Sequence, residues 1–206
     1  ADRLDAMRER GIAVTLLDRE IKGQKQCSVS VDDVNGGQIA IEFLASLGHK
    51  NIAWVCGPES IPQVSDRDAG VSKAAKVANV KIETVRVTLM NTIQGEEAAR
   101  AILAMPKKPT AIFCANDLLA LGVMRILNAN KVKVPDQMSV LGYDNIEFAS
   151  SAGIPLSSIA QPAYQMGVTA ANLLLDECEA GDDHRHQQIR FQPQLVERAS
   201  TAAAPK

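Results

Sequence analysis

The sequence predicts an α/β protein with parallel sheets, and three observations support this prediction. Short apolar runs alternate with amphipathic stretches along most of the 206 residues, which is typical of strands that alternate with helices. The content of 46% hydrophobic and 22% charged residues is close to the globular average, which excludes a disordered chain or a disulfide-dense scaffold. Finally, no internal repeat or low-complexity segment interrupts the pattern.

Helices are predicted where apolar residues recur at helical spacing and a glycine marks the end. The stretch Asp33–Leu47, for example, places Ala40, Phe43 and Leu44 on one face and ends before Gly48. Gly11 ends the first helix in the same way. The predicted helices span residues 3–10, 33–47, 66–78, 94–104, 116–128 and 164–178.

Strands are predicted at the short apolar runs, several of which are bounded by Gly or Pro. A polar loop around Gly23 separates the first two, and residues 202–206 form a loose tail. A helix without a preceding strand opens the chain, whereas doubly wound domains begin with a strand. We therefore expect the first sheet to be truncated at its start and less stable than the second. The predicted strands span residues 12–17, 28–31, 52–56, 82–88, 111–115, 138–141, 156–160, 187–191 and 194–196.

Composition excludes several classes of function. Lys plus Arg total 22 and Asp plus Glu total 24, so the chain lacks the basic excess of a stand-alone nucleic-acid binder. Aromatic residues are only 3%, too few for single-strand stacking platforms. No apolar run approaches the roughly 20 residues that span a bilayer. The four cysteines form no C-x-x-C pair, and Cys56 and Cys114 lie in apolar runs, which favours reduced thiols and a cytoplasmic protein.

Polar side chains follow several of the predicted strands. Because ligands bind beyond the carboxyl ends of parallel strands, these residues are candidates for a binding site. They can donate and accept hydrogen bonds in fixed geometry, which suits a ligand rich in hydroxyl or amide groups. The candidates are Asp32 and Asp33, then Arg67, Asn116 and Asp117, and finally Tyr143, Asp144 and Asn145.

Other interpretations stay open for these residues. Asp33, Asp66, Asn116 and Asp144 could each only cap the next helix. Phosphate-binding and nucleophile motifs are absent from the sequence, so no catalytic residue is predicted. His184 and His186, with Asp182 and Asp183, could bind a metal weakly, but a solvated loop is the preferred interpretation. His49 is expected to be structural, and no metal or cofactor is predicted.

Seven segments between Gly11 and Thr201, in their order and spacing, resemble the effector-binding core of LacI/GalR-family transcriptional regulators. They are GIAVTLLDR (Gly11–Arg19), VDDVNGGQIAIEFLASLGHKNIAWVCGP (Val31–Pro58), DRDAG (Asp66–Gly70), PTAIFCANDLLALGV (Pro109–Val123), VPDQMSVLGYDN (Val134–Asn145), IPLSSIAQP (Ile154–Pro162) and LVERAST (Leu195–Thr201).

The resemblance implies a two-lobed, type I periplasmic-binding-protein-like fold with a cleft and three crossover strands. The N-lobe would comprise residues 1–48, completed by 161–186. The C-lobe would comprise residues 49–158, completed by 187–201. The helix-turn-helix domain of such regulators is not in this sequence.

The resemblance also implies site residues. Arg67 in DRDAG matches the arginine that contacts the effector, Asn116 or Asp117 the next contact, and Asp144 the effector-binding aspartate. Asp32 matches the acidic position at the head of the following helix, although Asp33 is equally placed. Where relatives carry a stacking aromatic residue, this chain has Met90. Phe148 could line the cleft instead or pack in the core.

The implied function is that of an effector-sensing domain. It would bind a sugar, nucleoside or related metabolite and control operator binding by a helix-turn-helix domain in a cytoplasmic homodimeric repressor, with no membrane partner. The alternative is a periplasmic sugar-binding receptor of a transport system. An enzyme is not predicted.

Overall fold

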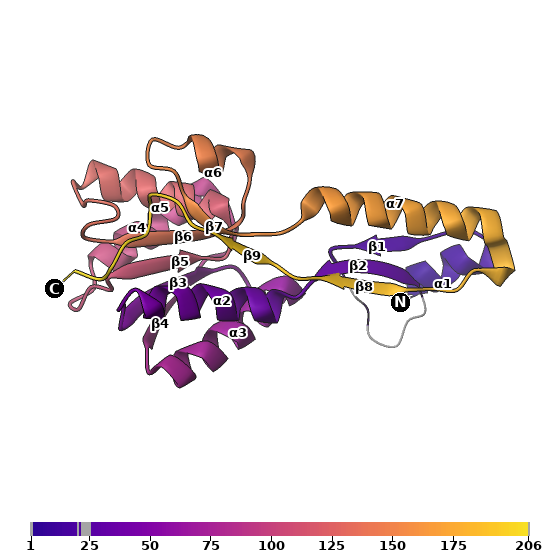
Figure 1. Ribbon diagram of the computed structural model, residues 1–206, viewed down its shortest axis with the longest axis horizontal. Helices are drawn as coiled ribbons and strands as arrows, with labels where there is room; N and C mark the ends of the chain where they lie inside the picture. The colour runs from indigo at the N-terminus through magenta and orange to yellow at the C-terminus, as the bar shows by residue number, and fades with distance from the viewer. Residues whose placement is uncertain (1, 20, 22–25, 206) are drawn as a thin grey trace. The chain divides into compact units, whose positions relative to one another are not determined.

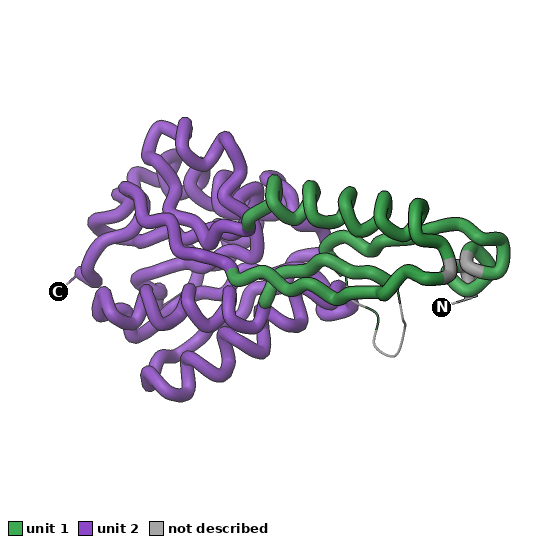
Figure 2. The backbone as a smooth tube through the Cα atoms, turned by 45° about the vertical axis from the view of Figure 1, so that its right-hand side comes forward, with its two compact units in different colours: residues 1–32, 162–192 green, residues 33–161, 193–206 purple. Residues whose placement is uncertain are grey.

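The computed structural model describes residues 2–19, 21 and 26–205, so the loop predicted around Gly23 lies outside the described residues. The chain divides into two compact units, residues 1–32 with 162–192 and residues 33–161 with 193–206 (Figure 2). It passes between them three times, after Asp32, Gln161 and Gln192.

These units divide the chain differently from the expected lobes. Helix α2 (Asp33–Ser46) packs against α3 (Pro62–Ala78), which places it in the larger unit. Strand β8 (Gln188–Phe191) pairs with β2 (Cys27–Val31), which places it in the smaller one.

The larger unit is built on a six-stranded sheet in the order β4-β3-β5-β6-β7-β9. Neighbouring strands are parallel except β9, which runs antiparallel to β7. The carboxyl ends of the five parallel strands therefore share one edge of the sheet. The strands are β3 (Asn51–Cys56), β4 (Lys81–Arg86), β5 (Ala111–Cys114), β6 (Ser139–Asp144), β7 (Ser157–Ala160) and β9 (Gln194–Val196).

Two helix pairs cover the two faces of this sheet (Figure 1). Helices α2 and α3 form one pair, and α4 (Thr92–Leu103) and α5 (Asp117–Ala129) form the other. A short helix, α6 (Glu147–Ser151), follows β6. The arrangement is the doubly wound architecture that the strand–helix alternation predicts.

Each helix pair packs through reciprocal glycines. A Cβ atom at Gly37 would lie 2.2 Å from the Arg67 carbonyl oxygen, and one at Gly70 would lie 2.0 Å from the Val34 carbonyl oxygen. In the other pair, a Cβ atom at Gly95 would lie 2.2 Å from the carbonyl oxygen of Leu119. The two backbones of each pair approach closely because these positions carry no side chain.

The core of the larger unit is centred on β3 and β5, whose residues are buried throughout. Trp54 stacks on Phe113 of the neighbouring strand, with ring centroids 4.6 Å apart, and its indole N–H donates to Asp68 Oδ1 at 2.8 Å. Its one polar atom is thus satisfied inside an apolar layer.

The C-terminal segment is tied into the same unit. Ser200 Oγ accepts from the Ser157 amide at 2.8 Å and donates to the Val140 carbonyl at 2.6 Å. His49 is fully buried between Thr110 Oγ1 and the Ala202 carbonyl. Burial lowers the pKa of this imidazole, and these contacts fit the structural role expected for His49.

The smaller unit contains a three-stranded parallel sheet in the order β1-β2-β8. Helix α7 (Ala163–Ala180) packs against β1 (Thr15–Leu17) and β2. Helix α1 (Asp2–Glu9) and the 3₁₀ turn η1 (Gly181–Asp183) complete the described elements. The buried hydrophobic core of this unit is small and consists of Cys27, Val29, Val31, Met166, Ala170 and Leu173.

The predicted elements agree closely with those observed, with three notable differences. Helix α3 begins at Pro62 instead of Asp66, because proline is favoured in the first helical turn. Strand β1 is shorter than predicted, and α6 was not predicted at all. None of the described helices is long and apolar enough to cross a membrane.

Candidate ligand-binding site

The carboxyl edge of the six-stranded sheet gathers most of the predicted site residues. Arg67, Met90, Asn116, Asp117, Asp144 and Phe148 all belong to the larger unit. Asp144 is the last residue of β6, Asn116 and Asp117 follow β5, and Arg67 lies in the second turn of α3, the helix that follows β3. Asn116, Asp117 and Asp144 therefore lie at the carboxyl ends of two neighbouring parallel strands, and Arg67 reaches the end of β5 from a helix.

Arg67 is almost completely buried and joins three elements. Its Nε donates to Asp33 Oδ1 at 2.8 Å, and its Nη1 donates to the Ala115 carbonyl at 2.5 Å. Its guanidinium carbon also lies 3.6 Å from the centroid of the Tyr143 ring. Among the described residues, none accepts a hydrogen bond from its Nη2 atom.

Asp33 and Tyr143 complete this buried cluster. The Tyr143 hydroxyl donates to Asp33 Oδ1 at 2.8 Å. Gly36 leaves room for that hydroxyl, because a Cβ atom there would lie 2.3 Å from the Tyr143 oxygen. Burial raises the pKa of Tyr143 well above its usual value, so the phenol remains a hydrogen-bond donor.

Asn116 is both a helix cap and a neighbour of Met90. Its Oδ1 accepts from the Leu119 amide at 2.9 Å, which caps α5, and its Nδ2 donates to the Met90 carbonyl at 3.0 Å. The Met90 side chain packs over Gly57, where a Cβ atom would lie 2.9 Å from its Cγ. The structure therefore places Met90 and Asn116 together at the ends of β4 and β5.

Asp117 is fully buried and lies under the loop that follows β6. Its carboxylate accepts from Ser158 Oγ at 2.7 Å and from the Ile146 amide at 2.8 Å. Burial raises its pKa to about 6, against the opposing effect of these two hydrogen bonds. Asp117 thus fixes the loop that follows Asp144, and its own side chain is not exposed.

Asp144 and Asn145 share an uncommon backbone conformation. Its φ is +98°, and that of the following Asn145 is +55°, values that non-glycine residues rarely adopt. Gln161 Nε2 donates to Asp144 Oδ1 at 2.7 Å, and Arg198 Nη2 donates to Asn145 Oδ1 at 2.7 Å. These contacts from distant segments hold the partly exposed Asp144 in place.

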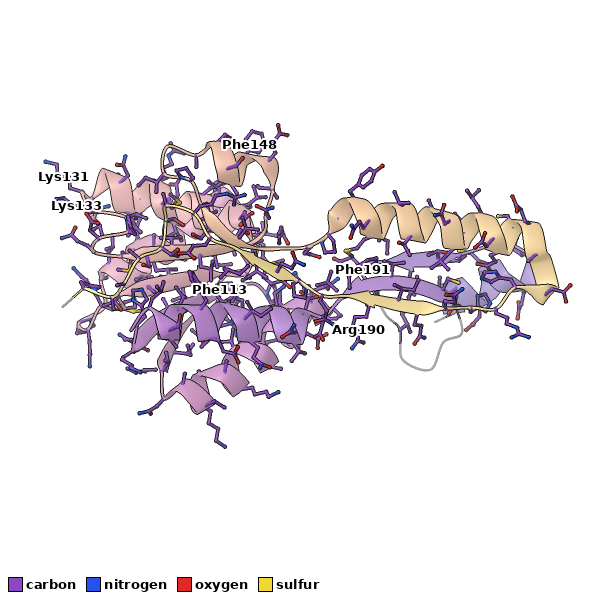
Figure 3. All side chains as sticks on the ribbon, viewed as in Figure 1. Phe113, Lys131, Lys133, Phe148, Arg190 and Phe191 are labelled. Carbon is purple, nitrogen blue, oxygen red and sulfur yellow. The ribbon has the colours of Figure 1, made fainter. Side chains whose placement is uncertain are left out.

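Phe148 and Asp32 are the remaining predicted site residues. Phe148 is on α6 and is 68% exposed, so it does not pack in the core (Figure 3). Asp32 belongs to the smaller unit, where its amide donates to the Phe191 carbonyl at 2.9 Å and Gln192 Nε2 lies 3.5 Å from its Oδ2. Of the two adjacent aspartates, only Asp33 contacts Arg67 among the described residues.

The capping interpretation holds for one of its four candidates. Asn116 caps α5. Asp66 lies within α3 and Asp33 is the first residue of α2, so neither is a cap. Asp144 does not cap α6, because the residue in the cap position of that helix is Ile146. Sequence reasoning missed the supporting residues Gln161, Ser158 and Arg198. Gln161 follows β7, so the strand-end rule could have identified it, whereas no local signal marks Arg198.

Comparison with known proteins agrees with this architecture. Residues 41–201 match the model of the periplasmic binding protein-like domain. The transcriptional repressor PurR of Vibrio campbellii is 39% identical over 166 residues, which cover 79% of this chain and 49% of the relative. The repressor CytR of Escherichia coli is 32% identical over 181 residues, which cover 86% and 52%. The chain spans about half the length of these curated relatives.

Solved structures match over nearly the whole chain. A LacI family transcriptional regulator from Enterococcus faecium with bound ribose has a TM-score of 0.90 and 29% identity, covering 98% of this chain and 76% of that chain. A complex of the transcriptional regulator CelR with cellobiose has a TM-score of 0.84 and 28% identity, covering 94% and 60%. The chain therefore belongs to the periplasmic binding protein-like domain family and corresponds to the effector-binding core of LacI-family repressors.

Proposed function

We propose that this chain is the ligand-sensing part of a LacI-type repressor and that it binds a sugar, nucleoside or related metabolite at the carboxyl edge of its six-stranded sheet. The observation that carries the proposal is the gathering of Arg67, Asn116 and Asp144 at this edge, in a chain that matches repressors over most of its length. Ribose and cellobiose in two similar structures support the ligand class.

In this proposal the partly exposed groups contact the ligand and the buried groups hold them in position. Asp144 accepts from ligand hydroxyl groups, Arg67 donates through Nη2, and Met90 and Phe148 supply apolar surface. Asp32 is proposed as a further contact from the smaller unit. A ligand that binds one conformation better than another shifts the population by its differential affinity.

The longer protein would convert this binding into control of DNA. We propose that a helix-turn-helix domain elsewhere in that protein binds operator DNA as a cytoplasmic homodimer. The chain itself would act by binding and not by turnover, since its relatives are named as repressors. A ligand that changes operator affinity of the longer protein would support this readout.

A thermal-shift screen tests the proposal directly. The panel contains pentoses, hexoses, disaccharides, sugar phosphates, nucleosides and purine bases. A ligand present at about 100 times its Kd should stabilise the native state by about 2.7 kcal/mol, which appears as a raised Tm. Failure of every class to raise the Tm would contradict the proposal.

Two variants locate the site of any ligand that binds. Asp144→Asn removes the charge that strengthens hydrogen bonds to ligand hydroxyl groups, so the affinity should fall roughly tenfold to a hundredfold. Asp136→Asn is the control, because Asp136 is an exposed aspartate at the opposite end of β6. Equal affinity in both variants would place the ligand elsewhere.

A further inference from the structure

A second cluster of chemically active side chains lies in the smaller unit, and the proposed function does not use it. Cys27 begins β2, Glu177 lies in the last turn of α7, and His184 and His186 follow η1. One ligand atom from each of these four residues lies within 4.8 Å of the other three. The pattern His184-x-His186 was visible in the sequence, but Cys27 lies 157 residues before His184 and Glu177 lies on a separate helix.

The distances within the cluster fit a tetrahedral metal ion. The Cys27 Sγ lies 3.1 Å from His184 Nε2 and 3.7 Å from His186 Nδ1. A zinc ion with Zn–S of about 2.3 Å and Zn–N of about 2.0 Å keeps its sulfur and nitrogen ligands about 3.5 Å apart. The two observed separations lie on either side of that value, so an ion can enter with small side-chain movements.

The local backbone explains why both histidines face the cysteine. Gly181 turns the chain after α7 with a φ of +53°, and His184 is already extended. Side chains two residues apart in an extended segment lie on the same side. The segment then enters β8, whose pairing with β2 fixes its register against Cys27.

Glu177 supplies an observation that independently points to a ligand. Its Oε2 atom is buried, yet it accepts no hydrogen bond from any residue that the structure describes. A buried carboxylate oxygen without a partner is costly unless a cation or a donor satisfies it. The amide of Gln187 also donates a hydrogen bond to Cys27 Sγ at 3.4 Å, which holds the sulfur beside the segment that carries the two histidines.

We propose that Cys27, Glu177, His184 and His186 form a binding site for a divalent transition-metal ion of the zinc class. One thiolate, two imidazoles and one carboxylate are a donor set suited to zinc. Glu177 and both histidines also line a cavity of about 790 Å³ in the same unit, which gives an ion a route to the site. The bound ion would link the start of β2 to the segment between α7 and β8.

A competition titration of the tag-free, chelator-treated chain with a chromogenic zinc indicator tests the site. We expect one zinc ion per chain and at least a tenfold loss of affinity in both Cys27→Ser and His186→Gln. His186 is exposed, so its variant tests the site even if a change at the buried Cys27 disturbs folding. Cys178→Ser is the matched control, because this exposed thiol lies next to Glu177 on α7 and should not affect binding.

Cobalt substitution shows whether the cysteine is a ligand. With Co²⁺, the wild-type chain and Cys178→Ser should show a thiolate-to-cobalt charge-transfer band, and Cys27→Ser should not. The proposal is overturned if the wild-type chain binds zinc no more tightly than His186→Gln. It is also overturned if the cobalt band survives in Cys27→Ser.

Discussion

Arg67 illustrates how one buried side chain can connect folding to recognition. Its guanidinium is ion-paired with Asp33, bonded to the end of β5 and packed on Tyr143. Two of its nitrogens therefore connect α3 to α2 and to the end of β5, and the third is the one that we propose contacts a ligand. The stability of this arrangement and its binding function should be separable by mutation.

Replacing Arg67 should destabilise the larger unit strongly. Arg67→Met leaves the buried Asp33 carboxylate without its charge partner, and breaking such a pair costs about 3–5 kcal/mol. Arg125→Met is the control: Arg125 is 79% exposed beside Glu96, and surface pairs contribute under about 1 kcal/mol. Urea unfolding followed by tryptophan fluorescence measures both, and equal effects would contradict a structural role for the Arg67–Asp33 pair.

Asp117 should make stability depend on pH. Its pKa rises from 3.8 to about 6 on folding, because burial disfavours the charged form. The native state therefore binds the proton more tightly than the unfolded state. Protonated Asp117 makes its whole stabilising contribution to the free energy of unfolding below pH 3.8, and this contribution is lost as the pH rises through 6. At neutral pH the loss amounts to up to about 3 kcal/mol.

Asp117→Asn isolates this contribution. The amide oxygen can still accept from the Ile146 amide, and the side chain no longer titrates. The free energy of unfolding of the variant, minus that of the wild type, should rise between pH 4 and pH 7. Urea titrations at several pH values measure this difference, and a flat difference would mean that Asp117 titrates normally.

At the scale of elements, the two helix pairs depend on glycine contacts that periodicity does not reveal. Helical spacing predicted α2 and α4 because it records which face is apolar. Helical spacing does not show which other helix packs against that face, or how close the two backbones lie. Helix α6 escaped prediction because five residues are too few to show a period.

Gly37→Ala should separate α2 from α3. The new Cβ atom would meet the Arg67 carbonyl oxygen at 2.2 Å, so the backbones must move apart, at a cost of about 1–3 kcal/mol. Gly167→Ala on α7 is the control, because nothing lies within 4 Å of its Cβ position. That change should instead stabilise its helix by about 0.5–1 kcal/mol. Thermal unfolding measures both effects: the Tm of Gly37→Ala should fall and that of Gly167→Ala should rise.

At the scale of the whole molecule, the two units should differ in stability. The larger unit buries an extensive core around β3 and β5, whereas the smaller one has a three-stranded sheet and a small core. Burial of apolar side chains is the main stabilising contribution to folding. The smaller unit should therefore unfold first.

The single tryptophan, Trp54, makes this prediction measurable. It lies in β3, so its fluorescence follows the larger unit, whereas far-ultraviolet circular dichroism follows both units and includes α7. In a urea titration the circular dichroism signal should begin to fall at a lower concentration than the fluorescence. Coincident transitions would indicate one cooperative unit.

Sequence reasoning reached the fold and much of the candidate site because both depend on local order along the chain. Strand ends are local, so Asn116 and Asp144 could be placed at one edge, and Arg67 was selected because it follows the polar segment after β3. The contacts of Arg198 with Asn145, and of Cys27 with His184, join segments that are far apart in the sequence and are brought together only by the tertiary fold. The spacing of residues along the chain does not predict such long-range contacts.

Hydrogen exchange with and without the ligand that gives the largest thermal shift tests the central claim most directly. The account predicts slower amide exchange in residues 87–94, 115–119 and 143–148, at the carboxyl ends of β4, β5 and β6. Exchange in residues 106–110 and 130–137, at the amino ends of β5 and β6, should be unchanged. Protection confined to those amino-end segments or to the cavity beside α7 would contradict a ligand site at the carboxyl edge.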